Sequence, residues 1–239
     1  GVPALVVAHI AAEGDCCADL QWEPLEGYFH AAAALNFLRA AEPDAELFTA
    51  REVVQIDLER ALTRRADSRW YNLGAHMVWL GERDAARNAE YLSDISNPIG
   101  LKVGPCLRAS ELQKLVRALN PDGEPGRLTL LTRYDAGSVE ALLPPHIEAV
   151  QATGVPVVWQ FDTDGIAASC VEDVLVEIFK CMAVHERFGT VLAGVHLEVS
   201  GSECVALAEE MLSRSDEVTF KLAAELRHGE RAAKRLKAV

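Results

Sequence analysis

The 239-residue sequence lacks several features by which protein classes are recognised. No window approaches the roughly 18 uninterrupted apolar residues of a membrane-spanning helix, and the N-terminal residues lack the basic region that precedes a signal-peptide core. No cysteines are paired in a CxxC motif, so neither a zinc ribbon nor a disulfide framework is indicated. These absences predict a cytoplasmic protein whose six cysteines are reduced, mostly buried thiols: Cys16, Cys17, Cys106, Cys170, Cys181 and Cys204.

Positive charge is also scarce. The chain has 23 Lys and Arg residues against 36 Asp and Glu residues, which gives a net charge of −13. The resulting field disfavours nonspecific binding to nucleic acid or to an anionic membrane, so an anionic substrate must be held by a few local cations. The composition, 50% hydrophobic and 25% charged, is that of a globular protein. Because a chain of this length can bury one large core, we expect residues 1–239 to form a single domain.

Apolar runs of strand length alternate with amphipathic helical patterns along the chain. The predicted strands are residues 4–10, 46–49, 75–80, 99–103, 128–132, 155–161 and 191–199. The predicted helices are residues 28–41, 51–65, 83–94, 109–119, 138–152, 170–187 and 202–213, with a charged final helix at about 216–237. This alternation is typical of a parallel sheet with both faces covered, either a doubly wound sheet or a (β/α) barrel.

Polar residues at the carboxyl ends of the predicted strands favour the barrel. They are Asp15, Cys16, Glu52, Glu82, Arg83, Lys102, Arg133, Asp162, Asp164 and Glu198. In a barrel these ends converge on one mouth, where active sites of that fold lie. A doubly wound sheet would concentrate them at one switch point, and no GxGxxG or Walker loop marks such a point. We therefore predict an α/β fold of the (β/α)8-barrel type. With about seven strands visible, we expect the first strand to pair with the one at 46–49, or a partner's segment to fill the gap.

Three cations end successive predicted strands of this acidic chain: Arg83, Lys102 and Arg133. Arginine presents a planar fork to carboxylate and phosphate, so the three together suit a small ligand that carries both groups. The alternative is that each cation pairs with a neighbouring carboxylate, such as Glu52 or Glu82, in a structural network.

The sequence indicates a metal site less strongly than it indicates the anion site. Cys16 ends the first predicted strand and Glu198 lies in the last, and these strands would be neighbours in a barrel, so the two side chains could share a divalent ion. A buried structural cysteine is the competing interpretation of Cys16. His76 and His196 lie within apolar strands and are interpreted first as core histidines, with metal or acid/base roles second.

Five ordered segments resemble the class II, plant-type 3-deoxy-D-arabino-heptulosonate 7-phosphate (DAHP) synthases, which open the shikimate pathway of aromatic biosynthesis. The segments are residues 14–16, 75–83, 97–105, 125–133 and 194–198. The resemblance implies a barrel with a phosphoenolpyruvate site and a divalent metal, Mn²⁺, Co²⁺ or Mg²⁺. It implies that Arg83, Lys102 and Arg133 hold phosphoenolpyruvate, that Glu52 and Glu82 line its pocket, and that Cys16 and Glu198 are metal ligands.

The chain also departs from the family pattern. The family's second strand ends in a Lys-Pro-Arg motif that supplies most of the aldose-phosphate site, and no such motif occurs here, which predicts a shortened barrel. Where the family has Cys-Asp-Pro-Met-His, this chain reads Phe161-Asp162-Thr163-Asp164-Gly165. The metal-binding histidine is therefore lost or replaced by Asp164, and Asp216 is the nearest candidate for the final ligand. The competing interpretation is that Asp162 or Asp164 caps the helix that follows. We expect a degraded metal site formed by Cys16, Asp164 and Glu198.

The resemblance implies an enzyme that condenses phosphoenolpyruvate with an aldose phosphate or another aldehyde and releases phosphate. Lys102, Arg133 and Glu52 are the predicted catalytic residues, and a homo-oligomer is expected. Because the motif for the aldose-phosphate site is missing, three alternatives stay open. The enzyme uses a different aldehyde, another chain supplies the missing groups, or the synthase activity is lost. In the last case the chain is a noncatalytic relative that binds a phosphorylated metabolite or a partner enzyme, or a repurposed lyase or hydrolase.

Overall fold

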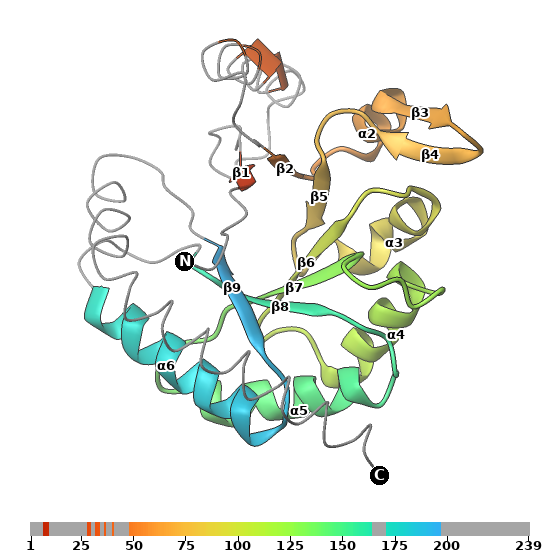
Figure 1. The fold of residues 1–239 in the computed structure, drawn as a ribbon. Coiled ribbons are helices and arrows are strands. Elements are labelled where there is room, and N and C mark those ends of the chain that lie inside the picture. Colours follow the sequence, from red (N-terminus) through yellow and green to blue (C-terminus); the bar gives the residue numbers. More distant parts are fainter. Residues whose placement is uncertain are drawn as a thin grey trace, which may run out of the picture. The chain divides into compact units, whose positions relative to one another are not determined.

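The computed structural model describes residues 7–9, 48–163 and 171–196, together with six helical positions between residues 28 and 40 (Figure 1). The chain divides into two compact units, each described here by itself. The first unit is Pro3–Leu101, and the second is Lys102–Val239 with Gly1–Val2. The helices predicted at 202–213 and 216–237 lie outside the described residues. Within the described part of the chain, no helix is long and apolar enough to cross a membrane.

Parallel strands form the core of the first unit. They are β1 (Val7–His9), β2 (Phe48–Glu52), β5 (Met77–Leu80) and the beginning of β6 (Ile99–Val103), in the order β1-β2-β5-β6. Val7 pairs with Phe48, Ala50 with Met77, and Val78 with Ile99. The predicted pairing of the first strand with the second is confirmed. Two helices accompany these strands, α2 (Ile56–Leu62) and α3 (Ala85–Asp94).

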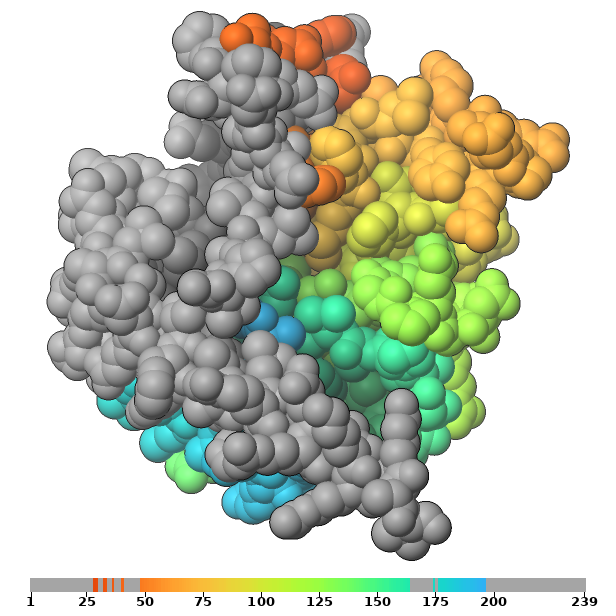
Figure 2. Space-filling model, in the orientation of Figure 1, coloured from red at the N-terminus to blue at the C-terminus, as the bar shows by residue number. Residues whose placement is uncertain are grey.

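A two-stranded hairpin interrupts the alternation. Strands β3 (Thr63–Ala66) and β4 (Arg69–Asn72) pair antiparallel and form a protruding orange lobe in Figure 2. The helix predicted at 51–65 is therefore wrong at both ends, because β2 continues through Glu52 and α2 stops at Leu62. The turn between the strands, Asp67 and Ser68, has positive φ at both residues, 46° and 73°. Two consecutive positive φ values match the right-handed twist of a hairpin.

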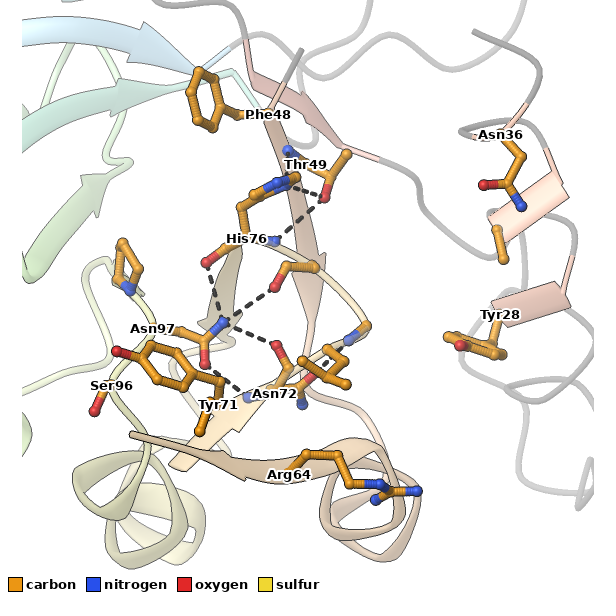
Figure 3. A pocket seen from close by; sticks show the side chains of 16 residues that line it. Tyr28, Asn36, Phe48, Thr49, Arg64, Tyr71, Asn72, His76, Ser96 and Asn97 are labelled. Carbon is orange, nitrogen blue, oxygen red and sulfur yellow. Dashed lines mark hydrogen bonds between the residues drawn. The ribbon is translucent and has the colours of Figure 1, made fainter. Parts of the chain in front are cut away.

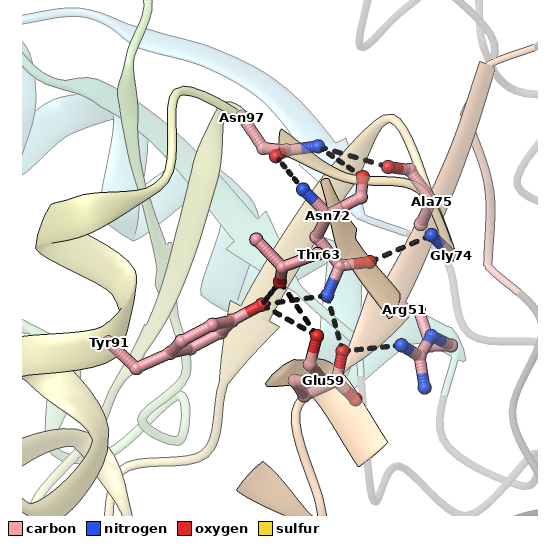
Figure 4. A network of polar contacts seen from close by, with 8 residues as sticks. All are labelled: Arg51, Glu59, Thr63, Asn72, Gly74, Ala75, Tyr91 and Asn97. Atoms are coloured by element: carbon pink, nitrogen blue, oxygen red, sulfur yellow. Dashed lines mark hydrogen bonds and ion pairs between the residues drawn. The ribbon is translucent and has the colours of Figure 1, made fainter. Parts of the chain in front are cut away.

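Buried polar side chains hold this hairpin to the rest of the first unit (Figure 4). Glu59, fully buried on α2, accepts hydrogen bonds from Arg51 and from Asn72 Nδ2 (2.6 Å). The Tyr91 hydroxyl on α3 contacts Thr63 Oγ1 (2.8 Å) and Asn72 Nδ2 (3.0 Å). Burial raises the pKa of Glu59, and the nearby Arg51 charge offsets part of that rise. The hairpin therefore depends on tertiary partners more than on the propensity of its own short strands.

The second unit repeats the strand and helix alternation. Strands β7 (Leu128–Thr132), β8 (Val158–Asp162) and β9 (Leu192–His196) are parallel, with a register shift between Trp159 and Gln160 on β8. Helices α4 (Ala109–Leu119), α5 (Val139–Gln151) and α6 (Val171–Arg187) alternate with them. Every residue of β7 is buried, as expected of a parallel strand covered on both faces. The Arg133 amide donates to the Val103 carbonyl (3.0 Å), which joins the carboxyl ends of β6 and β7.

Candidate active site

Charged side chains gather at the carboxyl ends of the strands in the second unit. Lys102 lies near the end of β6, Asp162 is the last residue of β8, and His196 is the last residue of β9. Lys102 Nζ is 3.5 Å from Asp162 Oδ2, and His196 Nδ1 is hydrogen-bonded to Asp162 Oδ1 (2.9 Å). The Asp162 side chain is only 1% exposed. One buried carboxylate therefore bridges a cation and an imidazole at the edge where (β/α) folds place their active sites.

Arg133 follows β7 directly and pairs with a carboxylate from α6. Its Nη1 is 2.5 Å from Glu177 Oε2, and the amide of Tyr134 donates to Glu177 Oε1 (3.1 Å). The Glu177 side chain is 4% exposed. Burial raises the pKa of Glu177, while the positive charge of Arg133 opposes the rise. A guanidinium has five N–H donors, so a carboxylate partner does not prevent Arg133 from binding a further anion.

The first unit presents its own predicted site residues in the same way. Glu52 is the last residue of β2, and the Gly81-Glu82-Arg83 segment follows β5. A Cβ atom on Gly81 would lie 3.2 Å from Glu52 Oε1, so the glycine lets this carboxylate lie close to the strand end. Glu82 is partly buried and Arg83 is exposed. The convergence of Arg83 with Lys102 and Arg133 stays a prediction, because they belong to different units.

The predicted metal ligands Cys16, Asp164 and Glu198 lie outside the described residues, as does Asp216. Among the described residues, no group of three or more His, Cys, Asp or Glu side chains could hold a metal ion. Asp162 and His196 do lie together, but they contribute only two donors and are hydrogen-bonded to each other.

A cavity lies elsewhere in the first unit. It measures about 890 Å³ and is lined in the first unit by Phe48, Thr49, His76 and Asn97, among others (Figure 3). These residues stand at the amino ends of β2, β5 and β6, whereas Glu52 and Glu82 follow the carboxyl ends. The cavity is thus separate from the predicted site. His76 is also not the core histidine expected from the sequence, because it is exposed before β5 and bonds to Thr49 Oγ1 (2.9 Å).

The sequence alone did not identify the two carboxylates that engage the cations. The sequence identifies Asp162 only as a polar residue at a strand end. Its contact with His196 could have been predicted, because the two residues end neighbouring strands. Glu177 carried no signal, since it is one acidic residue within an amphipathic helix.

Comparison with known proteins decides the family. Residues 42–225 match the model described as the Class-II DAHP synthetase family. The chain belongs to this family. A phospho-2-dehydro-3-deoxyheptonate aldolase of Streptomyces coelicolor is 37% identical over 202 residues, which cover 74% of this chain and 45% of the relative. The enzyme of the same name from Mycolicibacterium smegmatis is 36% identical over 211 residues, covering 76% of this chain and 45% of the relative.

A third relative of the same name, from Neurospora crassa, is 34% identical over 193 residues, covering 67% of this chain and 40% of the relative. The chain thus spans less than half the length of these family members. The solved structure of phospho-2-dehydro-3-deoxyheptonate aldolase from Francisella tularensis matches with a TM-score of 0.52 at 12% identity. It covers 81% of this chain and 62% of that one. This match confirms the predicted fold class, a shortened (β/α)-barrel type of α/β fold.

Proposed function

We propose that the chain acts as a DAHP-synthase-like enzyme that joins phosphoenolpyruvate to an aldose phosphate or another aldehyde. One observation carries the proposal: Lys102 and Arg133 lie on strand ends that are joined by the Arg133 to Val103 hydrogen bond. A cation pair at this edge of a parallel sheet suits a ligand with both a phosphate and a carboxylate. Membership of the family and the names of its relatives support the same reaction.

In the proposed reaction, Lys102, Arg133 and Arg83 hold the phosphate and carboxylate of phosphoenolpyruvate. The C3 carbon attacks the aldehyde carbon and forms the new C–C bond, and the aldehyde oxygen takes a proton. Water then adds at C2 and gives up one proton. The bond between C2 and the phosphate oxygen breaks as the new C2 hydroxyl becomes a ketone, and the hydroxyl proton leaves with inorganic phosphate. The cations oppose the negative charge on the departing phosphate. Glu52 is the proposed acceptor for the proton of the attacking water, with Glu82 lining the same pocket.

The proposal includes a degraded metal site, in which Cys16, Asp164 and Glu198 would hold a divalent ion only weakly. Such an ion, when bound, supplies Lewis-acid polarisation of the aldehyde oxygen. Two carboxylates beside one thiolate would move the preference toward Mg²⁺ or Mn²⁺ and away from Co²⁺. Metal analysis of protein purified without chelator tests this: tightly held stoichiometric metal would contradict the expected degraded site.

We also propose a cytoplasmic homo-oligomer, as the sequence predicts.

Phosphate release from phosphoenolpyruvate, measured against a panel of aldehydes that includes aldose phosphates, tests the activity. We expect release that requires both substrates and that falls in Arg133→Ala. The matched control is Arg117→Ala, an exposed arginine on α4. Release that is equal in the two variants, or absent with every aldehyde, contradicts the proposal.

A noncatalytic binder of a phosphorylated metabolite is the second candidate. The observation that favours it is that Lys102 and Arg133 are already matched with buried carboxylates, Asp162 and Glu177, as in structural ion pairs. Calorimetric titration with phosphoenolpyruvate separates the two candidates. Binding without turnover on any aldehyde supports the binder, whereas turnover removes it.

A further inference from the structure

Glu177 makes two contacts at the end of β7. Its Oε2 accepts from the Arg133 guanidinium, and its Oε1 accepts from the Tyr134 backbone amide (3.1 Å). One buried carboxylate thus fixes both the side chain of a predicted substrate-binding residue and the backbone that follows it. A carboxylate with only the first contact would neutralise charge, whereas the second contact also sets the direction in which the strand end leaves the sheet.

Further contacts hold the same segment. Lys180, three residues after Glu177 on α6, donates from Nζ to the Ala136 carbonyl (2.6 Å). The Tyr134 hydroxyl is hydrogen-bonded to His146 Nδ1 on α5, and the two rings stack. His146 Nε2 in turn is hydrogen-bonded to the Leu107 carbonyl (2.7 Å). Residues 133–136 are therefore held from two helices, and their conformation is set before any ligand binds.

This arrangement is costly for stability alone. Burial raises the pKa of Glu177 even with Arg133 beside it, so ionising this carboxylate costs more in the folded protein than in water. Replacing a buried ion pair with apolar residues of similar volume is often neutral or stabilising. A buried charge that is retained beside a substrate-binding cation is more readily explained by orientation of that cation.

We propose that Glu177 is a positioning residue that orients the Arg133 guanidinium toward the anionic substrate, an inference that rests on the proposed function. It acts through Arg133 and does not touch the substrate. The charge and the length of the side chain both matter, because one carboxylate must reach the guanidinium and the Tyr134 amide together. Aspartate is one methylene shorter and cannot make both contacts without movement of the backbone.

Titration of the full-length chain with phosphoenolpyruvate tests this in Glu177→Asp and Glu177→Gln. Loss of one charge-assisted contact corresponds to about tenfold weaker binding, so we expect about that change in each variant. The matched control is Glu140→Gln, which removes a carboxylate 3.2 Å from Lys180 Nζ and leaves Arg133 untouched. We expect the control to bind within about twofold of the wild type, because an exposed ion pair contributes little.

A double-mutant cycle separates positioning from general destabilisation. If Glu177 acts through Arg133, then Glu177→Gln has no further effect on phosphoenolpyruvate binding in an Arg133→Ala background. Equal weakening with and without Arg133 would overturn the inference, as would wild-type affinity in both Glu177 variants. Wild-type protein that fails to bind phosphoenolpyruvate would instead remove the proposed function and this inference with it.

Discussion

The ammonium group of Lys102 lies 3.5 Å from the carboxylate of Asp162, with the two side chains 17% and 1% exposed. Asp162 also bonds to His196, so it cannot move toward solvent without breaking a second contact. The positive charge that the sequence assigns to substrate binding is thus opposed by a fixed negative charge. In the proposed function, a phosphate or carboxylate bound by Lys102 would share it with Asp162, and this competition would lower affinity while Asp162 keeps the lysine in place.

Replacement of Lys102 should therefore affect both binding and stability. In Lys102→Met we expect phosphoenolpyruvate binding to weaken by about 1.5–3 kcal/mol, the value of a hydrogen bond to a charged group. The unfolding free energy should also fall, by at most about 3–5 kcal/mol, because the buried Asp162 loses its cation and keeps the His196 contact. Calorimetric titration and urea unfolding measure the two effects. Lys114→Met, at an exposed position of α4, is the control and should change neither.

The buried carboxylate of Glu59 should make the first unit less stable as pH rises. Because burial raises its pKa above the ordinary value of 4.5, the folded state keeps this proton more readily than the unfolded state. Stability is then lost as pH increases from about 4.5 through the raised pKa. Glu59→Gln cannot ionise, so its unfolding free energy should improve relative to the wild type across that window. Urea unfolding at several pH values measures the difference.

Tyr91→Phe is the control for this pH dependence. It removes a hydroxyl that contacts Thr63 and Asn72 in the same network, at a cost of about 1 kcal/mol. That cost should be the same at every pH. If the unfolding free energy of Glu59→Gln changes with pH in the same way as that of the wild type, the carboxylate does not titrate as its burial predicts.

The sequence predicted the second unit better than the first for a physical reason. Strand 128–132 and the helix 109–119 have the predicted bounds, since buried parallel strands are continuous apolar runs and α4 has one apolar face; strand 99–103, which is divided between the units, also has the predicted bounds. The hairpin at Thr63–Asn72 was missed because its strands are only four residues long and mostly exposed, so they carry no apolar run. Its stability comes from Glu59 and Tyr91, which are distant in sequence from at least one strand and could not be paired from local pattern.

For the candidate site, the sequence predicted which cations would end strands but not their partners. Lys102 was identifiable because it interrupts an apolar run, and Arg133 because it directly follows one. Glu177 was not, because the turn of α6 that faces Arg133 depends on how the helix packs. Pairing with Glu52 or Glu82 was considered from the sequence, whereas the observed partners of Lys102 and Arg133 come from β8 and α6.

The hairpin turn offers a stabilising substitution. Ser68 has φ of 73°, a left-handed conformation that costs an L residue about 1–2 kcal/mol and costs glycine almost nothing. Part of the gain is offset by the greater freedom of glycine in the unfolded chain, so Ser68→Gly should stabilise by about 0.5–1 kcal/mol. Thermal unfolding measures this. Ala118→Gly, the same added glycine at an exposed position within α4, should instead destabilise by about 1 kcal/mol.

The fully buried His185 should make the second unit sensitive to acid. Its ring packs on Trp159, and Nδ1 is hydrogen-bonded to Thr190 Oγ1 (2.8 Å). Burial lowers the pKa of His185 from 6.5 to about 4. The unfolded state therefore binds the proton more readily between these values, and stability is lost as pH falls from 6.5 toward 4. A pKa shift of this size corresponds to a loss of roughly 3 kcal/mol of unfolding free energy once the pH has fallen to the lowered pKa.

His185→Gln removes the titrating group and keeps a side chain that can bond to Thr190. We expect its unfolding free energy to change less than that of the wild type between pH 7 and 4, as measured by urea unfolding. His146 is also buried with a lowered pKa, but it is present in both proteins, so its contribution cancels in the difference. If the unfolding free energies of the wild type and of His185→Gln change in parallel down to pH 4, then His185 is protonated in the folded state as easily as in the unfolded chain. That result would require water or a carboxylate to reach a ring that the structure encloses completely.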